Sequence, residues 1–270
     1  MTRLLASDLD GTLLQSGGTV SQENFQAIAR ARAQGLDVLF VTGRPPRWMY
    51  EIAQMTGSSG LAICANGALT LDLDSHEIVD VDLIDGEIGL EVARRLLQVD
   101  PNISFAVELA RHEDAFVIDP TYRPRWETQV EVPRMHVESM FDSDLVVKLM
   151  ARPSAQASHD ADTFLESVHS AVGDLVDVTH SNIFDVLLEM SVLGVNKGTG
   201  LARFASGRGL DATQVAAVGD MPNDLAMIEW AGRGAAVANA HPMVKEIADE
   251  HLPTNDDHAV SIFIDRILSS

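Results

Sequence analysis

Short apolar runs alternate with amphipathic segments in the first third of the chain. Leu4 to Ser7 is an apolar run that ends in acidic residues, and Val38 to Val41 and Leu61 to Cys64 are two further continuous apolar runs. Runs of this kind, bounded by turn residues, predict strands that are covered on both faces. The amphipathic segments between them predict helices. Strand–helix alternation at this spacing predicts a parallel, doubly wound sheet.

The first predicted helix has ends that can be located. Ser21 is suited to cap its N-terminus, and Gly35 supplies the left-handed residue that ends it. Phe25, Ile28 and Ala29 share its apolar face.

The pattern changes between about residues 84 and 190. Strand-like runs occur at 103–109, 115–118, 145–150 and 186–190, and helical periodicity occurs around 88–97 and 160–172. This texture predicts an α+β unit that folds as its own layer. Strand–helix alternation returns after Lys197. We therefore expect an α/β fold, with a doubly wound parallel-sheet core at residues 1–83 and 191–270 and an inserted α+β domain at residues 84–190.

Composition narrows the classes of function. Hydrophobic residues make up 46% of the chain and charged residues 22%, which is typical of a folded globular protein. The 40 acidic and 19 basic residues give a formal charge of −21. Because this charge repels polyanions, we do not expect nucleic acid as a partner. A phosphate site in such a field needs local positive charge from a metal ion, a lysine or an arginine.

Cysteine count and the N-terminal residues bear on the compartment. Cys64 is the only cysteine, so no disulfide can form within the chain. The segment from Met1 runs at once into a predicted strand, and no apolar run approaches the length of a membrane span. We expect a cytoplasmic protein, a monomer or a homodimer, with no membrane partner.

Four short polar segments stand at the predicted carboxyl ends of strands or at the start of the next helix. They are Asp8-Leu-Asp10-Gly-Thr, Thr42-Gly43-Arg44, Gly-Val-Asn-Lys197-Gly and Gly219-Asp-Met-Pro-Asn-Asp224. Open α/β sheets bind their ligands at this edge. Each segment alone is typical of an acidic turn or a solvated lysine, but their order and placement together indicate one site.

The residue types in these segments suit phosphoryl transfer. A carboxylate can attack phosphorus if its charge is offset, so Asp8 is the candidate nucleophile. Asp8 and Asp220 come from separate strands and could bind Mg²⁺, which prefers oxygen ligands. The hydroxyl of Thr42, the backbone N–H of Gly43 and the ammonium of Lys197 are suited to hold a phosphate.

These segments resemble the motifs of the haloacid dehalogenase superfamily, and in particular of its Cof-type phosphatase branch. That branch has the motifs in this order, with a large α+β cap between the second and the third. The resemblance extends over nearly the whole chain, including Ala65-Asn-Gly-Ala68, Leu187 to Met190 and Ala238 to Lys245. It implies a Rossmann-like core with a cap inserted into it. One departure is His258-Ala-Val260, where such proteins often carry Gly-Val at the start of the last helix.

The resemblance also implies roles for further residues. Asp10 would bind the metal through its backbone carbonyl, while its side chain would act first as an acid and then as a base. Asn223 would lie near the phosphate and Lys197. Asp224 would either bind the metal directly or support the residues that do. The roles of Arg44 and Arg47 stay open, since attraction of phosphate and capping of the surface explain these residues equally well.

The sequence thus predicts a magnesium-dependent phosphatase with an aspartyl-phosphate intermediate on Asp8. Its substrate would be a small phosphorylated metabolite, such as a sugar phosphate, a nucleotide or a phosphorylated cofactor. Two alternatives stay open. A sugar phosphomutase or phosphotransferase would pass the phosphoryl group to a hydroxyl group instead of water. A non-catalytic acidic module would bind a metal ion or a phosphoprotein.

Overall fold

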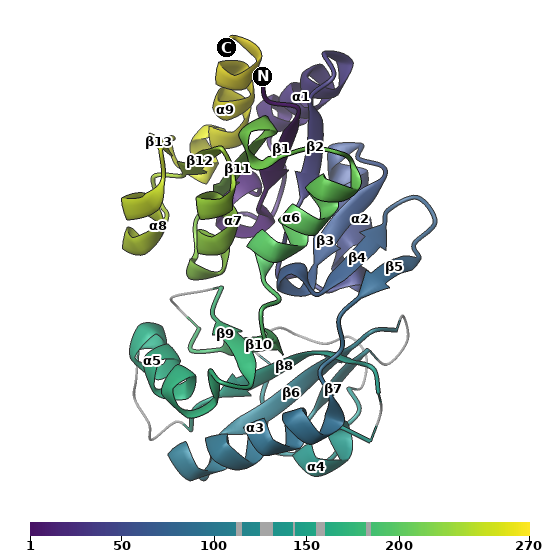
Figure 1. Cartoon of the computed structure of the whole chain (residues 1–270), viewed down its shortest axis with the longest axis vertical. Coiled ribbons are helices and arrows are strands. Elements are labelled where there is room, and N and C mark those ends of the chain that lie inside the picture. The colour runs from purple at the N-terminus through teal and green to yellow at the C-terminus, as the bar shows by residue number, and fades with distance from the viewer. Residues whose placement is uncertain (112–114, 125–131, 143, 155–159, 182–184) are drawn as a thin grey trace. The chain divides into compact units, whose positions relative to one another are not determined.

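The computed structural model describes residues 1–111, 115–124, 132–142, 144–154, 160–181 and 185–270 (Figure 1). The chain forms two compact units. The first unit consists of Met1–Asp80 and Asn196–Ser270, and the second consists of Val81–Val195. The sequence placed these boundaries at residues 83/84 and 190/191.

A parallel sheet forms the centre of the first unit. Its strand order is β13-β12-β11-β1-β2, and all neighbours pair in parallel. The strands are β1 (Leu4–Ser7), β2 (Asp37–Phe40), β11 (Val215–Gly219), β12 (Arg233–Ala236) and β13 (Glu250–His251). From β1 the chain winds to β2 on one side, and from the central β11 it winds to β12 and β13 on the other. This confirms the doubly wound α/β fold.

A small antiparallel sheet continues the unit beyond β2. β3 (Leu61–Cys64) meets the end of β2 through a parallel bridge between Val41 and Ile63. It then pairs antiparallel with β4 (Leu69–Asp72), which β5 (Ile78–Val81) follows. The chain reverses between β3 and β4 through left-handed residues, among them Asn66 with φ +56° and Gly67 with φ +100°. The sequence analysis identified β3 but not the two strands after it.

Helices lie on both faces of the parallel sheet. They are α1 (Gln22–Ala33), α2 (Met49–Thr56), α6 (Lys197–Gly207), α7 (Leu225–Trp230), α8 (Pro242–Ile247) and α9 (Ala259–Leu268). Leu201 of α6 and Met227 of α7 belong to one buried cluster with Ala6 of β1. α1 and α9 pack against each other, on the other side of the strands from α6 and α7 (Figure 1).

The ends of α1 and α2 follow local rules. The side chain of Ser21 accepts a hydrogen bond of 3.1 Å from the N–H of Asn24, which caps α1 as predicted. Gly35 follows α1 with φ +82°, and Gly57 ends α2 with φ +59°. Both glycines adopt the left-handed conformation that ends a helix at little steric cost.

The buried face of α1 differs from the predicted apolar face. Phe25 is 39% exposed and Ala29 is also exposed, so the prediction for these two residues is wrong. Asn24 is buried instead, because its amide donates to the carbonyl of Leu13 at 3.0 Å and its side-chain oxygen accepts from the N–H of Ser261 at 2.9 Å. Apolar periodicity cannot reveal a polar residue that is buried by such partners. The buried residues of α1 are Asn24, Ala27, Ile28 and Ala31.

The second unit is an antiparallel sheet with helices packed against it. The strand order is β7-β6-β8-β10-β9. The strands are β6 (Ser104–Leu109), β7 (Phe116–Ile118), β8 (Val146–Arg152), β9 (Val176–Thr179) and β10 (Leu188–Val192). The helices are α3 (Gly86–Val99), α4 (Val137–Met140) and α5 (Ala161–Val172). Val92 of α3 and Phe164 of α5 share a buried core with Phe105 of β6, which confirms an α+β insert.

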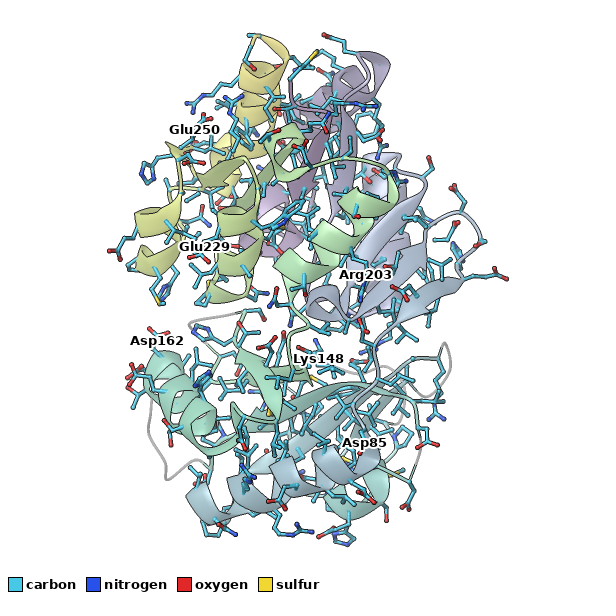
Figure 2. All side chains as sticks on the ribbon, viewed as in Figure 1. Asp85, Lys148, Asp162, Arg203, Glu229 and Glu250 are labelled. Carbon is cyan, nitrogen blue, oxygen red and sulfur yellow. The ribbon has the colours of Figure 1, made fainter. Side chains whose placement is uncertain are left out.

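Charged side chains also join elements at the surface of the first unit. Glu250 of β13 accepts hydrogen bonds from Arg233 of β12 and from Arg266 of α9, the latter at 3.1 Å (Figure 2). The pairs therefore connect the edge of the parallel sheet to the last helix. Within the described ranges, none of the helices is both long and apolar enough to cross a membrane.

His258 occupies the left-handed conformation just before α9, with φ +61°. For a residue with a Cβ this conformation costs about 1–2 kcal/mol, which a glycine would avoid. Glycine would in turn lose about 0.5–1 kcal/mol more conformational entropy on folding, so the net gain in stability is smaller. The contact of His258 with Glu23 at 3.6 Å joins two partly exposed side chains and adds little. We predict that His258→Gly raises the free energy of unfolding by about 0.5–1 kcal/mol in calorimetry or urea denaturation.

Gly35→Ala is the matched control for this prediction. Gly35 has φ +82°, and a Cβ added there meets nothing within 4 Å, so only backbone strain is introduced. It should lower the free energy of unfolding by a similar amount. A destabilised His258→Gly variant would contradict the prediction.

Candidate active site

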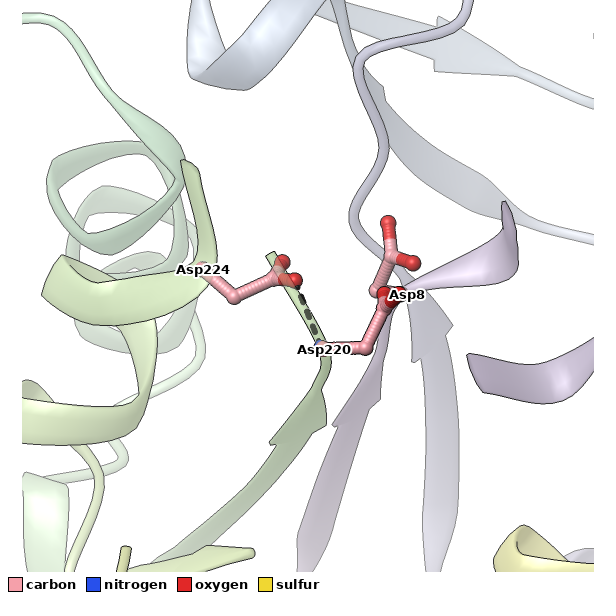
Figure 3. A group of neighbouring side chains, drawn as sticks. All are labelled: Asp8, Asp220 and Asp224. Carbon is pink, nitrogen blue, oxygen red and sulfur yellow. Dashed lines mark hydrogen bonds between the residues drawn. The ribbon is translucent and has the colours of Figure 1, made fainter. Parts of the chain in front are cut away.

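Two neighbouring strands bring Asp8 and Asp220 to the same edge of the parallel sheet. Ser7 of β1 lies opposite Val218 of β11, and the N–H of Asp8 donates to the carbonyl of Val218 at 3.0 Å. Asp8 directly follows β1, and Asp220 directly follows β11. Asp224 joins them from a short turn before α7, and carboxylate oxygens of the three residues lie within 4.8 Å of one another (Figure 3). All three side chains are buried.

Lys197 lies between two of these carboxylates. Its ammonium nitrogen is 2.6 Å from Oδ1 of Asp8 and 2.7 Å from Oδ1 of Asp224, and the side chain is fully buried. Lys197 is the first residue of α6, whose N-terminus is capped by Asn196 through a 3.0 Å hydrogen bond from the N–H of Thr199. The cap fixes the start of the helix, and with it the position of the lysine.

Asp224 is held on both of its oxygens. While Oδ1 accepts from Lys197, Oδ2 accepts from the backbone N–H groups of Asp220, at 2.9 Å, and Met221, at 3.0 Å. Figure 3 marks the bond to Asp220 with a dashed line. Asp224 therefore fixes the backbone of the turn that carries Asp220 as well as the lysine.

Two glycines allow the backbone to approach these carboxylates. A Cβ on Gly11, which has φ +77°, would lie 2.3 Å from Oδ2 of Asp220, and a Cβ on Gly219 would lie 2.4 Å from Cγ of Asp224. Neither position has room for any other residue. Thr12 adds a hydrogen bond of 3.0 Å to Oδ1 of Asp220. The sequence analysis included Thr12 in the first motif but assigned it no role.

The buried carboxylates carry more negative charge than the lysine offsets. Burial raises the pKa of Asp8 to about 7, and the charges of Asp224 and Asp10 add to the rise while that of Lys197 opposes it. Burial also raises the pKa of Asp220 well above its ordinary value, with further increases from Asp8 and Asp224. Burial alone would lower the pKa of Lys197, but the carboxylates of Asp224 and Asp8 outweigh it and raise that pKa.

The donor set fits a divalent cation. With all three carboxylates ionised, the single ammonium would leave a net charge of −2 in a buried space. The available donors are carboxylate oxygens, which hard divalent cations such as Mg²⁺ and Ca²⁺ prefer. A bound cation would favour the ionised forms of Asp8 and Asp220 and so lower the raised pKa values of both.

Asp10 lies outside this buried group. Its side chain is 56% exposed, and its two oxygens accept hydrogen bonds of 2.7 Å from Nε and 2.6 Å from Nη2 of Arg44. Among the described residues, the group of carboxylates close enough to share a cation does not include the Asp10 side chain. The sequence analysis left the role of Arg44 open and did not predict this pair, because motif spacing does not fix side-chain rotamers.

The other predicted phosphate-binding residues lie on neighbouring segments. Thr42 and Gly43 follow β2, the neighbour of β1, and buried Thr42 donates its N–H to the carbonyl of Ile63 at 2.9 Å. Asn223 lies in the turn that carries Asp224, and its amide donates to Oδ1 of Asn66 at 3.0 Å. Asn66 was quoted only as part of a weak motif, so its contact with Asn223 was also missed.

The fold and the site together indicate the class of protein. A doubly wound α/β unit presents buried carboxylates and a lysine at the carboxyl ends of its strands, the edge at which open α/β sheets bind ligands. The chain belongs to the haloacid dehalogenase-like hydrolases, since a model of that family matches residues 5–264.

Relatives and solved structures agree with this assignment. The chain is 28% identical to 5-amino-6-(5-phospho-D-ribitylamino)uracil phosphatase YwtE of Bacillus subtilis strain 168, over 99% of this chain and 98% of the relative. It is 26% identical to the putative phosphatase YxeH of the same organism, over 99% of both chains. The similarity extends over the full length of these phosphatases, and the chain is a phosphatase of the haloacid dehalogenase-like family.

Two solved structures share the fold. BT1666 from Bacteroides thetaiotaomicron, a phosphatase of this superfamily, superposes with a TM-score of 0.79 at 22% identity and covers 100% of this chain and 96% of its own. The subclass IIB sugar phosphatase BT4131 superposes with a TM-score of 0.81 at 17% identity, covering 98% and 99%.

The raised pKa of Asp8 gives a prediction for the metal-free protein. Because the folded-state pKa of about 7 exceeds the unfolded value, ionisation of Asp8 destabilises the fold increasingly as pH rises toward 7. Asp8→Asn removes this effect. It should raise the free energy of unfolding more at about pH 8 than at about pH 5.5, with a difference on the order of 1–2 kcal/mol.

Urea denaturation in the presence of a chelator measures this difference. Asp142→Asn, which changes an exposed carboxylate, is the control and should show no such trend. The explanation fails if the stabilisation by Asp8→Asn stays constant or shrinks as the pH rises.

Proposed function

We propose that the protein is a magnesium-dependent phosphomonoester hydrolase that transfers the phosphoryl group of a small metabolite first to Asp8 and then to water. The observation that carries this proposal is the ammonium of Lys197, buried at 2.6 Å from Asp8 and 2.7 Å from Asp224, beside Asp220. A buried nucleophilic carboxylate flanked by a fixed cation is the arrangement that attack on an anionic phosphate requires.

Each residue has a defined part in the proposed reaction. An oxygen of Asp8 attacks phosphorus, and the bond from phosphorus to the ester oxygen breaks. Asp10 gives its proton to the departing oxygen and later takes a proton from the water that attacks the aspartyl-phosphate. The exposure of the Asp10 side chain supports this role, because a proton carrier must reach both groups. Bound Mg²⁺ would neutralise charge on the phosphoryl oxygens.

Binding of phosphate and metal is divided among the remaining residues. Lys197, the hydroxyl of Thr42 and the N–H of Gly43 would hold the phosphoryl oxygens, with Asn223 beside them. Asp8 and Asp220 would bind the metal through their carboxylates, and Asp10 through its backbone carbonyl.

Asp224 would act behind the metal ligands rather than in contact with the metal. Both of its oxygens already accept hydrogen bonds, from Lys197 and from the backbone of Asp220 and Met221. It therefore supports the ligand and the lysine, as residues around metal sites commonly do.

The substrate is proposed to be a small phosphorylated metabolite in the cytoplasm, handled by a monomer or homodimer. Sugar phosphates, nucleotides and phosphorylated cofactors form the first panel for testing. 5-Amino-6-(5-phospho-D-ribitylamino)uracil belongs in it, since the full-length relative YwtE is named for its dephosphorylation.

Release of free phosphate from this panel, with Mg²⁺ and with a chelator, tests the proposal. We predict that Asp8→Asn lowers turnover by at least about 10³-fold, because it removes the nucleophile with little change of shape. Lys197→Ala should lower it by about 10²–10³-fold through loss of one electrostatic contact. Lys245→Ala removes the same charge from α8, outside the site, and should leave turnover unchanged.

Two results would contradict the proposal. Parental rates in Asp8→Asn would exclude the aspartyl-phosphate route. A phosphorylated acceptor that accumulates in place of free phosphate would instead identify a phosphotransferase or mutase.

A further inference from the structure

The contact between Arg44 and Asp10 has an anchored member and an exposed one. The Arg44 side chain is 19% exposed, whereas that of Asp10 is 56% exposed. Two parallel hydrogen bonds join them, from Nε to Oδ2 at 2.7 Å and from Nη2 to Oδ1 at 2.6 Å. A fork of this kind fixes the plane of a carboxylate as well as its position.

The backbone of Arg44 is itself fixed on two sides. Its N–H donates to the hydroxyl oxygen of Thr42 at 3.0 Å, and its carbonyl accepts from the N–H of Ala65 at 3.0 Å. Its guanidinium carbon lies 6.0 Å from the ring centre of Trp48. The backbone of Arg44 is thus bound to the segment after β3, and its guanidinium holds the carboxylate of Asp10 relative to that segment.

Asp10 needs such support because little else holds its side chain. It lies in the turn after β1, followed by Gly11 with φ +77°. An exposed aspartate can adopt several rotamers at small cost. A misplacement of about 1 Å in a group that transfers a proton can lower a rate about 10²-fold.

We propose that Arg44 is a positioning residue for Asp10, which it orients for proton transfer to the departing oxygen. This inference rests on the proposed function, in which Asp10 is the acid and then the base. The two hydrogen bonds use two of the roughly four lone-pair sites of the carboxylate, so one site on each oxygen remains for the proton. The proton passes from Asp10 to the ester oxygen as the bond to phosphorus breaks, and a proton from water restores it.

The alternative role for Arg44 is capture of the substrate phosphate. The geometry favours positioning, because the fork of Nε and Nη2 is directed at Asp10. The two roles predict different kinetics. Loss of a phosphate contact lowers kcat/KM for every substrate alike, whereas loss of acid positioning lowers kcat/KM only for substrates whose leaving group needs a proton. The later step, in which Asp10 acts as a base, follows departure of the leaving group and does not enter kcat/KM.

Two substrates and three variants separate these roles. 4-Nitrophenyl phosphate has a leaving group that departs without a proton, and a hexose 6-phosphate has one that requires it. For Arg44→Ala we expect kcat/KM to fall about 10–10²-fold with the hexose phosphate and less than about threefold with 4-nitrophenyl phosphate. For Arg44→Lys, which keeps the charge but not the two parallel hydrogen bonds, kcat/KM with the hexose phosphate should lie between the values of the parent and of Arg44→Ala. Arg47→Ala, a neighbouring arginine, should affect both substrates equally.

Equal losses with both substrates in Arg44→Ala, or no loss with either, would overturn the inference. Crystal structures of the parent and of Arg44→Ala provide a readout that does not depend on turnover. We expect one Asp10 rotamer in the parent and several, or a different one, in the variant. An unchanged Asp10 rotamer in the variant also overturns the inference. If the parent hydrolyses neither these two substrates nor any member of the panel above, the proposed function fails, while the crystal structures still decide whether Arg44 orients Asp10.

Discussion

The buried ammonium of Lys197 is the interaction on which the rest of the site depends. It contacts Asp8 and Asp224 at 2.6 and 2.7 Å, and its side chain is fully buried. Loss of this ammonium would leave the buried carboxylates without a counter-charge, which is strongly destabilising. Burial raises the pKa values of Asp8 and Asp220, and repulsion among three carboxylates that one ammonium does not balance raises them further. The ionised carboxylates therefore carry an excess of negative charge, which a bound divalent cation would neutralise.

The doubly wound sheet makes this concentration of charge possible. Parallel neighbours β1 and β11 end at the same edge, so Asp8 and Asp220 meet without any adjustment of the chain. Gly11 and Gly219 leave the room in which the carboxylates sit. Asp224 then binds backbone N–H groups and Lys197 together. Repulsion between carboxylates is concentrated where the reaction is proposed to occur, as is common at functional sites.

The sequence predicted what depends on strand order and motif spacing, and it missed what depends on individual side-chain contacts. The doubly wound core and the α+β insert follow from periodicity, and the structure brings Asp8, Lys197, Asp220 and Asp224 together. The pair of Arg44 with Asp10 depends on two rotamers, which no spacing encodes. Burial of Asn24 in place of Phe25 depends on two backbone partners, Leu13 and Ser261, and Ser261 is 237 residues away in the sequence. In the β4–β5 segment, the alternation of apolar and polar residues in Leu69–Asp72 is a strand signal that was overlooked, whereas Ile78–Val81 has no clear period.

Calorimetric titration of the metal-free protein with Mg²⁺ tests the central claim most directly. If the buried carboxylates form a site for one divalent cation, the parent should bind one Mg²⁺ per chain. Binding should release protons at about pH 7, because the bound cation lowers the raised pKa of Asp8. Asp220→Asn should abolish or greatly weaken this binding. A parent that binds no Mg²⁺, or an Asp220→Asn variant that binds it as tightly as the parent, would contradict the account.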